Sequence, residues 1–212
     1  SWTPRNNGLV GDALKIRFMS TMVDKILLST QAGLYLSTNQ GQSWTQVGPK
    51  DSSGNWIRPG HTAIDFVNPT TFYLAVYNTD PVAVSYPGNG LWKSTDSGAT
   101  WTAITAFNGR RMEDVRVIRT SAGNMVAAAS WDDPATTTNG LYFSLDGGSS
   151  WSAPVALNLV AAVNSVLDAP PLVSSRAGLY KWDTTLGLNE RRNFMTSVSN
   201  NAVHYYYVYN LS

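Results

Sequence analysis

Apolar residues at alternate positions, such as Leu14, Ile16 and Phe18, open a series of short runs along the chain that turn-forming residues separate. This period of two is typical of β-strands with one buried face, and no stretch shows convincing helical spacing. The pattern predicts an all-β protein. Strands are expected in pairs, at 14–19 and 25–30, 63–67 and 72–76, 114–119 and 125–130, 163–167 and 172–174, and 197–201 and 203–208.

A hairpin motif follows the first four pairs, and it is clearest at Gly90–Trp101, with the sequence GLWKSTDSGATW. Gly140–Trp151 keeps the whole motif, and Gly33–Trp44 keeps all of it except the acid, which is Asn39. A fourth copy at Gly178–Asp183 keeps the strand and loses the turn. Two strands followed by a hairpin make units of four strands.

The tryptophans that end the motif, at positions 44, 101 and 151, are 57 and 50 residues apart. Short strands that recur in groups of four with a period near 40 to 50 residues are typical of β-propeller blades. We therefore expect a β-propeller of about four to five four-stranded blades, as a single domain over residues 1–212 that is either whole or a segment of a longer propeller. The repeats are expected near 14–45, 63–102, 114–152 and 163–194, with a partial one at 197–212 that pairs with residues 1–3 and closes the ring.

Each position of the repeated turn has a physical reason. Glycine tolerates the positive φ that a tight hairpin turn requires. Short Asp, Asn and Ser side chains accept hydrogen bonds from the amides of the turn, and tryptophan supplies a large apolar plate. We assign a structural role to Ser37, Asn39, Gly41, Trp44, Ser94, Asp96, Gly98, Trp101, Ser144, Asp146, Gly148 and Trp151.

Composition narrows the function classes. The net charge is +1 with no basic stripe, which argues against nucleic-acid binding. The chain has no Cys and no apolar run near the ~20 residues of a membrane span. Low charge and many aromatic residues favour an exported protein at the cell surface or outside the cell. The two histidines, His61 and His204, are too few and too far apart for a metal cluster, so no metal or cofactor is expected.

The Ser-x-Asp-x-Gly-x-x-Trp pattern resembles the Asp-box, or bacterial neuraminidase repeat. This repeat is found in the propellers of sialidases, oligoxyloglucan hydrolases and sortilin-type receptors, and in a photosystem assembly factor. The resemblance implies a propeller in which the boxes lie at the periphery, on the face away from any active site.

Strand alternation then predicts where a binding site lies, because the connections that do not carry the box turns must collect on the opposite face. Long loops with aromatic and charged residues on a rigid scaffold are common binding sites. Trp56, Tyr86 and Trp131 are expected to stack on sugars, with hydrogen bonds from Arg58 and Asp132. The full set of ligand-binding candidates is Trp56, Arg58, His61, Asp80, Tyr86, Arg111, Trp131, Asp132, Asp133 and Arg176.

No catalytic residue is assigned. Glycoside hydrolysis needs two carboxylates about 5 to 9.5 Å apart, and Asp80 with Asp132 or Asp133 is the available pair. The Arg-Ile-Pro segment of sialidases is scrambled here to Ile57-Arg58-Pro59. Where the oligoxyloglucan-hydrolase resemblance places an acid in the first blade, this chain has Gln31.

The sequence therefore predicts an extracellular module that binds a glycan or a protein partner. Two alternatives stay open. One is an exo-acting glycoside hydrolase, sialidase-like or xyloglucanase-like, or a fragment of one. The other is a structural subunit of a larger surface or viral assembly, in which further chains join this one.

Overall fold

A computed structural model describes residues 3–9, 16–22, 24–77, 88–120, 123–130, 140–153, 163–168, 171–175, 178–183 and 187–192 of the chain. The described part is all-β, with four antiparallel sheets and one short 3₁₀ helix. Strands follow chain order within every sheet, as expected for a meander. The all-β prediction is therefore confirmed.

Three of the sheets have four strands and the third has three. The first sheet contains β1 (Ile16–Met22), β2 (Lys25–Thr30), β3 (Gly33–Ser37) and β4 (Thr45–Val47). The second contains β5 (Thr62–Ile64), β6 (Phe72–Val76), β7 (Gly90–Ser94) and β8 (Thr102–Ala103). The third contains β9 (Met112–Thr120), β10 (Gly123–Ser130) and β11 (Gly140–Ser144). The fourth contains β12 (Val163–Asp168), β13 (Pro171–Ser175), β14 (Gly178–Asp183) and β15 (Gly187–Arg192).

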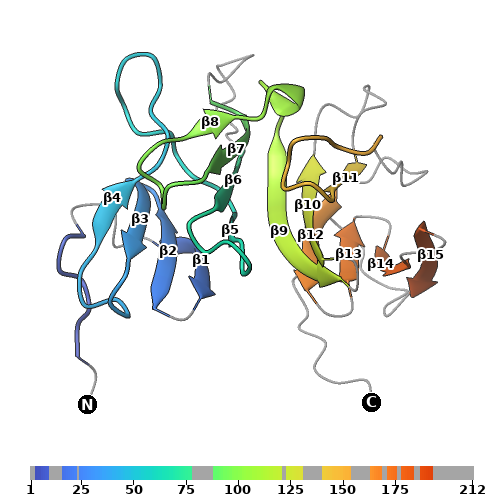
Figure 1. Cartoon of the computed structure of the whole chain (residues 1–212), viewed down its shortest axis with the longest axis horizontal. Helices are drawn as coiled ribbons and strands as arrows, with labels where there is room; N and C mark the ends of the chain where they lie inside the picture. Colours follow the sequence, from blue (N-terminus) through green and yellow to red (C-terminus); the bar gives the residue numbers. More distant parts are fainter. Residues whose placement is uncertain are drawn as a thin grey trace, which may run out of the picture.

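The sheets stand side by side in chain order, as Figure 1 shows. Their first strands lie innermost, since β1 contacts β5, β5 contacts β9, and β9 contacts β12. This is a propeller-like arrangement. It is an open arc within the described residues, because no comparable contact joins the first sheet to the fourth. The predicted closing pair, residues 197–212 with 1–3, falls almost wholly outside the described residues, so ring closure and the division into repeats stay predictions.

Several details differ from the sequence prediction. The strand predicted at 63–67 is shorter and ends at Ile64, because the carboxylate of Asp65 accepts the amides of Val67 and Asn68 and turns the chain. Among the described residues the third sheet lacks a fourth strand, and Ser152 alone pairs with Phe143 at its edge.

Two further corrections concern segments that the sequence left irregular. Between the hairpin strand at Gly178–Asp183 and the run at 197–201 no strand was predicted, but Gly187–Arg192 forms β15 and pairs with β14. A short 3₁₀ helix, η2 (Thr105–Phe107), forms where no helix was expected.

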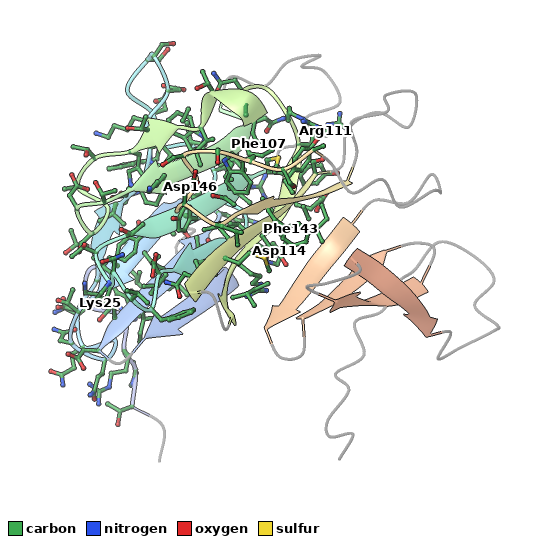
Figure 2. All side chains as sticks on the ribbon, turned by 45° about the vertical axis from the view of Figure 1, so that its right-hand side comes forward. Lys25, Phe107, Arg111, Asp114, Phe143 and Asp146 are labelled. Atoms are coloured by element: carbon green, nitrogen blue, oxygen red, sulfur yellow. The ribbon has the colours of Figure 1, made fainter. Side chains whose placement is uncertain are left out.

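Hydrophobic clusters fill the spaces between neighbouring sheets. Between the first and second sheets, aliphatic residues including Leu34 and Leu74 pack with Trp101. Between the second and third sheets, Tyr73 and Val126 pack around Phe107, which is 1% exposed. Figure 2 shows Phe107 inside the molecule rather than on its surface. The sheets are thus held together by apolar packing, as expected for a chain without cysteine.

The connections divide between two faces. On one face, Lys25 Nζ donates to the carbonyl of Pro69 at 2.6 Å, and the Ser97 amide donates to Thr70 at 2.8 Å. These bonds join the β1–β2, β5–β6 and β7–β8 turns. We call this side the turn face, and the opposite side, which carries the β4–β5, β6–β7 and β8–β9 connections, the loop face. In Figure 2, Lys25 lies at the lower left and Arg111 at the upper right of the part drawn with side chains, one from each face.

Candidate functional site

The repeated turn of the second sheet is held by its own side chains. Ser94 Oγ donates to Asp96 Oδ1 and accepts the Gly98 amide, both at 2.8 Å. Asp96 Oδ1 accepts the Thr100 amide at 2.9 Å, and Asp96 Oδ2 accepts the Thr100 hydroxyl at 2.5 Å. Gly98 has a φ of 86°, in the left-handed region that favours glycine. The carboxylate therefore belongs to the turn and does not face a ligand.

The turn of the third sheet repeats this arrangement with Ser144, Asp146, Gly148 and Ser150. The serine–aspartate bond is 2.7 Å, and Asp146 Oδ2 accepts the Ser150 hydroxyl at 2.5 Å. These bonds stabilise the ionised acids: they lower the pKa of Asp96 to about 2 and shift the pKa of Asp146 in the same direction.

In the first sheet Asn39 replaces the acid and keeps the geometry. Its Oδ1 accepts the Ser37 hydroxyl and the Ser43 amide at 2.9 Å, and its Nδ2 donates to Ser43 Oγ at 2.8 Å. The hydroxyl side chain just before each tryptophan was not singled out from the sequence. Its signal was the recurrence of Ser43, Thr100 and Ser150 at one position of the motif.

Each of the three tryptophans of the motif contacts the part of the chain that precedes its sheet. Trp101 joins the cluster between the first and second sheets. Trp151 meets Phe107 edge-to-face, with ring centroids 4.9 Å apart. Trp44 packs against the buried pair Leu28 and Tyr35, as Leu9 does, and donates from Nε1 to the carbonyl of Arg5 at 2.8 Å. Each tryptophan thus covers apolar residues of its own sheet or of the sheet before it.

Only part of the predicted ligand set can be placed. Trp56 and Arg58 are exposed on the β4–β5 connection, and His61 and Arg111 are half-buried near the starts of β5 and β9. The structure does not bring Trp56 and His61 together around one cavity. The remaining candidates lie outside the described residues: Asp80, Tyr86, Trp131, Asp132, Asp133 and Arg176.

His61 belongs to a buried polar cluster between the second and third sheets. Its Nδ1 lies 3.0 Å from Asp114 Oδ1, and Arg116 Nε lies 3.3 Å from Asp114 Oδ2. Asp114 is fully buried and also accepts the Val115 amide at 2.9 Å. Asp114 lies on β9, within the predicted strand 114–119, and contributes to the contact between the sheets. Because Asp114 is paired with His61 and Arg116, its buried charge is compensated. The cluster therefore stabilises the contact between the sheets and does not form an open binding site.

The aromatic contact that anchors the β8–β9 connection was not predicted from the sequence. Phe107 on η2 meets Tyr142 edge-to-face at 5.0 Å, and the Arg110 guanidinium lies 5.0 Å from the centre of the Tyr142 ring. Both geometries are favourable for aromatic rings. The only feature of the sequence that could have indicated this contact was a single phenylalanine in an otherwise polar connection.

The β4–β5 connection, drawn in cyan in Figure 1, is a small folded loop. Asp51 accepts the amides of Ser53 and Asn55 at 2.9 Å, which lowers the pKa of its carboxyl. An antiparallel bridge then places Lys50 beside Trp56, with Nζ 4.3 Å from the centre of the ring. The loop therefore presents a preformed pair of an ammonium and an indole.

A groove of about 390 Å³ begins at this loop, on the outer side of the contact between the first and second sheets. Trp92 from β7 and Trp101 from the second turn line it together with Trp56 and Lys50. Trp92 was not among the predicted site residues, and Trp101 was assigned a structural role alone. The residues that complete the groove are Gly48, Pro49 and Ala99.

The described residues contain no group of three or more His, Cys, Asp or Glu side chains that could hold a metal ion. In the same part of the chain, no helix has the length and apolar character needed to cross a membrane.

No protein-family model matches the chain. A curated xyloglucanase from Paenibacillus sp. is 32% identical over 104 residues, which are 48% of this chain and 9% of that protein. The chain therefore spans a small part of the curated relative that it matches.

Solved structures share the fold at lower identity. An ancestral GH74 enzyme has a TM-score of 0.62 at 20% identity, over 92% of this chain and 26% of that chain. The GH74 xyloglucanase of Xanthomonas campestris has a TM-score of 0.56 at 22% identity, over 81% and 27%. YCF48 bound to a D1 peptide has a TM-score of 0.57 at 15% identity, over 86% and 56%. These likenesses establish a propeller-like fold, and this chain spans about a quarter of the GH74 enzymes.

Proposed function

We propose that this chain is part of an extracellular, glycoside hydrolase-like propeller whose loop face binds a xyloglucan-type β-glucan. The match to a xyloglucanase at 32% identity over 104 residues is the observation that carries the proposal. The shared fold with two GH74 enzymes supports it. The comparisons support the glycoside hydrolase alternative better than the predicted binding module.

The hydrogen bonds of the repeated turns favour their identification as Asp-boxes, which is part of the same proposal. In each turn a serine hydroxyl, an Asp or Asn side chain and a glycine amide form one closed set. Side chains engaged in this way stabilise the turn face, which leaves the loop face for the ligand. Exposed Arg58 on the β4–β5 connection is then a candidate to donate hydrogen bonds to sugar hydroxyls.

Retardation of the purified chain in native gels that contain xyloglucan tests the proposal. We expect retardation, weakened by Arg58→Ala and unchanged by Leu145→Ser, a control on the turn face at a residue that is 72% exposed. Absence of retardation of the folded chain, together with no release of reducing ends from xyloglucan, would overturn the proposal.

A second candidate is binding without hydrolysis, and Gln31 favours it. Gln31 is exposed in the tight turn between β2 and β3, at the position where the oligoxyloglucan-hydrolase resemblance places an acid. An amide cannot act as a general acid or base in glycoside cleavage. Retardation by xyloglucan with no new reducing ends would favour this candidate, and measurable release of reducing ends would reject it.

A further inference from the structure

We propose that the groove lined by Lys50, Trp56, Trp92 and Trp101, here called the rim groove, binds a saccharide that carries a carboxylate, such as a hexuronate oligomer. This goes beyond the proposed function, which concerns a neutral glucan on the loop face. The rim groove lies on the outer side of two neighbouring sheets. Its aromatic residues come from three different segments of the chain: the β4–β5 connection, β7 and the second turn.

The indole N–H groups of two of these tryptophans are already engaged. Trp92 Nε1 donates to the carbonyl of Gly88 at 2.9 Å, and Trp101 Nε1 donates to that of Gly98 at 3.1 Å. These bonds engage the polar edges of the two rings, and both rings also pack against the cluster between the first and second sheets, so each is held in place while it lines the groove and stays half-buried. The apolar face of a pyranose ring is a suitable partner for such a surface.

The volume fits a ligand of this kind. About 390 Å³ lies within the range of small-molecule sites in proteins. Trp56 is 36% exposed, one of few large apolar side chains that reach this level among the described residues. An exposed indole next to two half-buried ones gives a stepped aromatic surface along which consecutive sugar units can lie.

The charge of the residues that line the rim groove indicates which class of saccharide it would bind. Lys50 is the only charged residue that lines the groove among the described residues, and no carboxylate lines it. The nearby carboxylate of Asp51 is engaged by the amides of its own turn. The ammonium of Lys50 is held over the Trp56 ring, so a ligand stacked on the groove meets a cation at its end. A carboxylate on the sugar would form a charge-assisted hydrogen bond there.

The groove is also preformed. The Ile57 amide donates to the carbonyl of Pro49 at 3.0 Å, and the Asp51 amide donates to Asn55 at 2.8 Å, so both strands of the small loop are paired. Gly98 of the second turn packs on Val47 at the end of β4, which brings Trp101 to the loop. Little ordering is therefore needed when a ligand binds, and affinity benefits from this.

Two hexamers that differ only in oxidation at C6 provide the test: a β-1,4-linked glucuronate hexamer and cellohexaose. Titration of the full chain is followed by tryptophan fluorescence and calorimetry. We expect the glucuronate hexamer to bind about tenfold or more tightly than cellohexaose, as for a hydrogen bond to a charged group. The preference should weaken with added salt.

Two exposed residues provide variants that leave the core intact. Lys50→Gln should remove the preference for glucuronate, and Trp56→Ala should weaken both ligands. Arg5→Gln removes an exposed cation outside the groove and should change neither. Equal affinity for the two hexamers, an unchanged preference in Lys50→Gln, or no binding of glucuronate by the folded chain would each overturn the inference. Xyloglucan binding without glucuronate binding would reject this inference and leave the proposed function standing, and the reverse result would reject only the proposed function.

Discussion

The two faces of the sheets are built on different principles. On the turn face, three copies of one motif share the hydrogen bond from the amide just before the tryptophan to Asp96, Asp146 or Asn39. On the loop face the described β4–β5 and β8–β9 connections differ: the first contains a folded loop with Trp56, and the second contains a 3₁₀ helix that buries Phe107. Repetition marks the part of the molecule that stabilises the first three sheets in the same way. Individual connections are where binding can differ from one sheet to the next.

One residue, Trp101, departs from this division between the two faces. Trp101 belongs to the repeated motif, yet it lines the rim groove beside Trp56 from the loop-face connection. A residue of the turn can therefore serve both the packing of its sheet and a surface for a ligand. The predictions below test how far the two faces are separate.

The largest effect is expected at a buried residue of the loop face. Phe107→Ala removes a fully buried ring from between the second and third sheets, and we expect a loss of about 3–5 kcal/mol in the free energy of unfolding. Urea denaturation followed by fluorescence measures it, with Phe107→Leu as a milder control. A loss below about 1 kcal/mol would show that the site can collapse or that Phe107 is not buried.

A smaller loss is expected on the turn face. Ser94→Ala removes both the bond to Asp96 and the acceptor of the Gly98 amide, so we expect a loss of about 1–3 kcal/mol. Saccharide affinity should not change. Thr95→Ala, at an exposed residue of the same turn, is the matched control and should be neutral. A change in affinity with unchanged stability in Ser94→Ala would contradict the separation of the faces.

Lowering the pH should affect the turn that contains Asp96 and leave the turn that contains Asn39 unchanged. The pKa of Asp96 lies near 2, below its ordinary value of 3.8, so the bonds of its ionised form are complete above about pH 4 and are lost as the pH falls through 2. Asn39 has no such titration. The Thr100 and Ser43 amides both donate to this position at 2.9 Å, so their chemical shifts report it directly. We expect the Thr100 amide to titrate with a midpoint near pH 2.

The control is Asp96→Asn, in which the Thr100 amide should lose its own titration. A midpoint near the ordinary value, or the same titration at Ser43, would show that the hydrogen bonds do not stabilise the ionised acid.

The smallest effect is expected at Tyr35 in the first sheet. Its buried hydroxyl has no hydrogen-bond partner among the described residues, and burial raises its pKa. Tyr35→Phe should therefore raise the free energy of unfolding by up to about 1 kcal/mol, because a desolvated group is removed and no bond is lost. Thermal denaturation measures it against Tyr142→Phe, whose ring lies between other sheets. A clear loss of stability in Tyr35→Phe would mean that the hydroxyl is bonded.

Local pattern was enough to predict much of the fold. Short apolar runs between turn residues predicted β2 and β6 at their exact residues, and the recurrence of Ser, Asp, Gly and Trp predicted the hairpins before β4 and β8. These features depend on neighbours in the sequence. The burial of Asp114 could not be predicted in this way, because it depends on a partner from another segment, His61. The shortening of β5 has a local cause, the bonds from the amides of Val67 and Asn68 to Asp65, which the apolar pattern alone did not reveal.

The candidate site was predicted less well, for the same reason. Exposure of Trp56 and Arg58 on a connection followed from topology. The grouping of Trp56 with Trp92 and Trp101 did not, because it depends on how two sheets pack and on which face of β7 carries each side chain. Stacking of Trp56 with Tyr86 and Trp131 stays a prediction, since the latter two lie outside the described residues.

The central claim is that the loop face binds a β-glucan and the turn face does not. Amide chemical shifts of the folded chain, recorded during titration with a xyloglucan oligosaccharide, test it most directly. We expect changes concentrated in residues 48–61 and 104–111, with the turn amides of Gly41, Gly98 and Gly148 unmoved. Changes centred on those turn amides, or no changes at any ligand concentration, would contradict it.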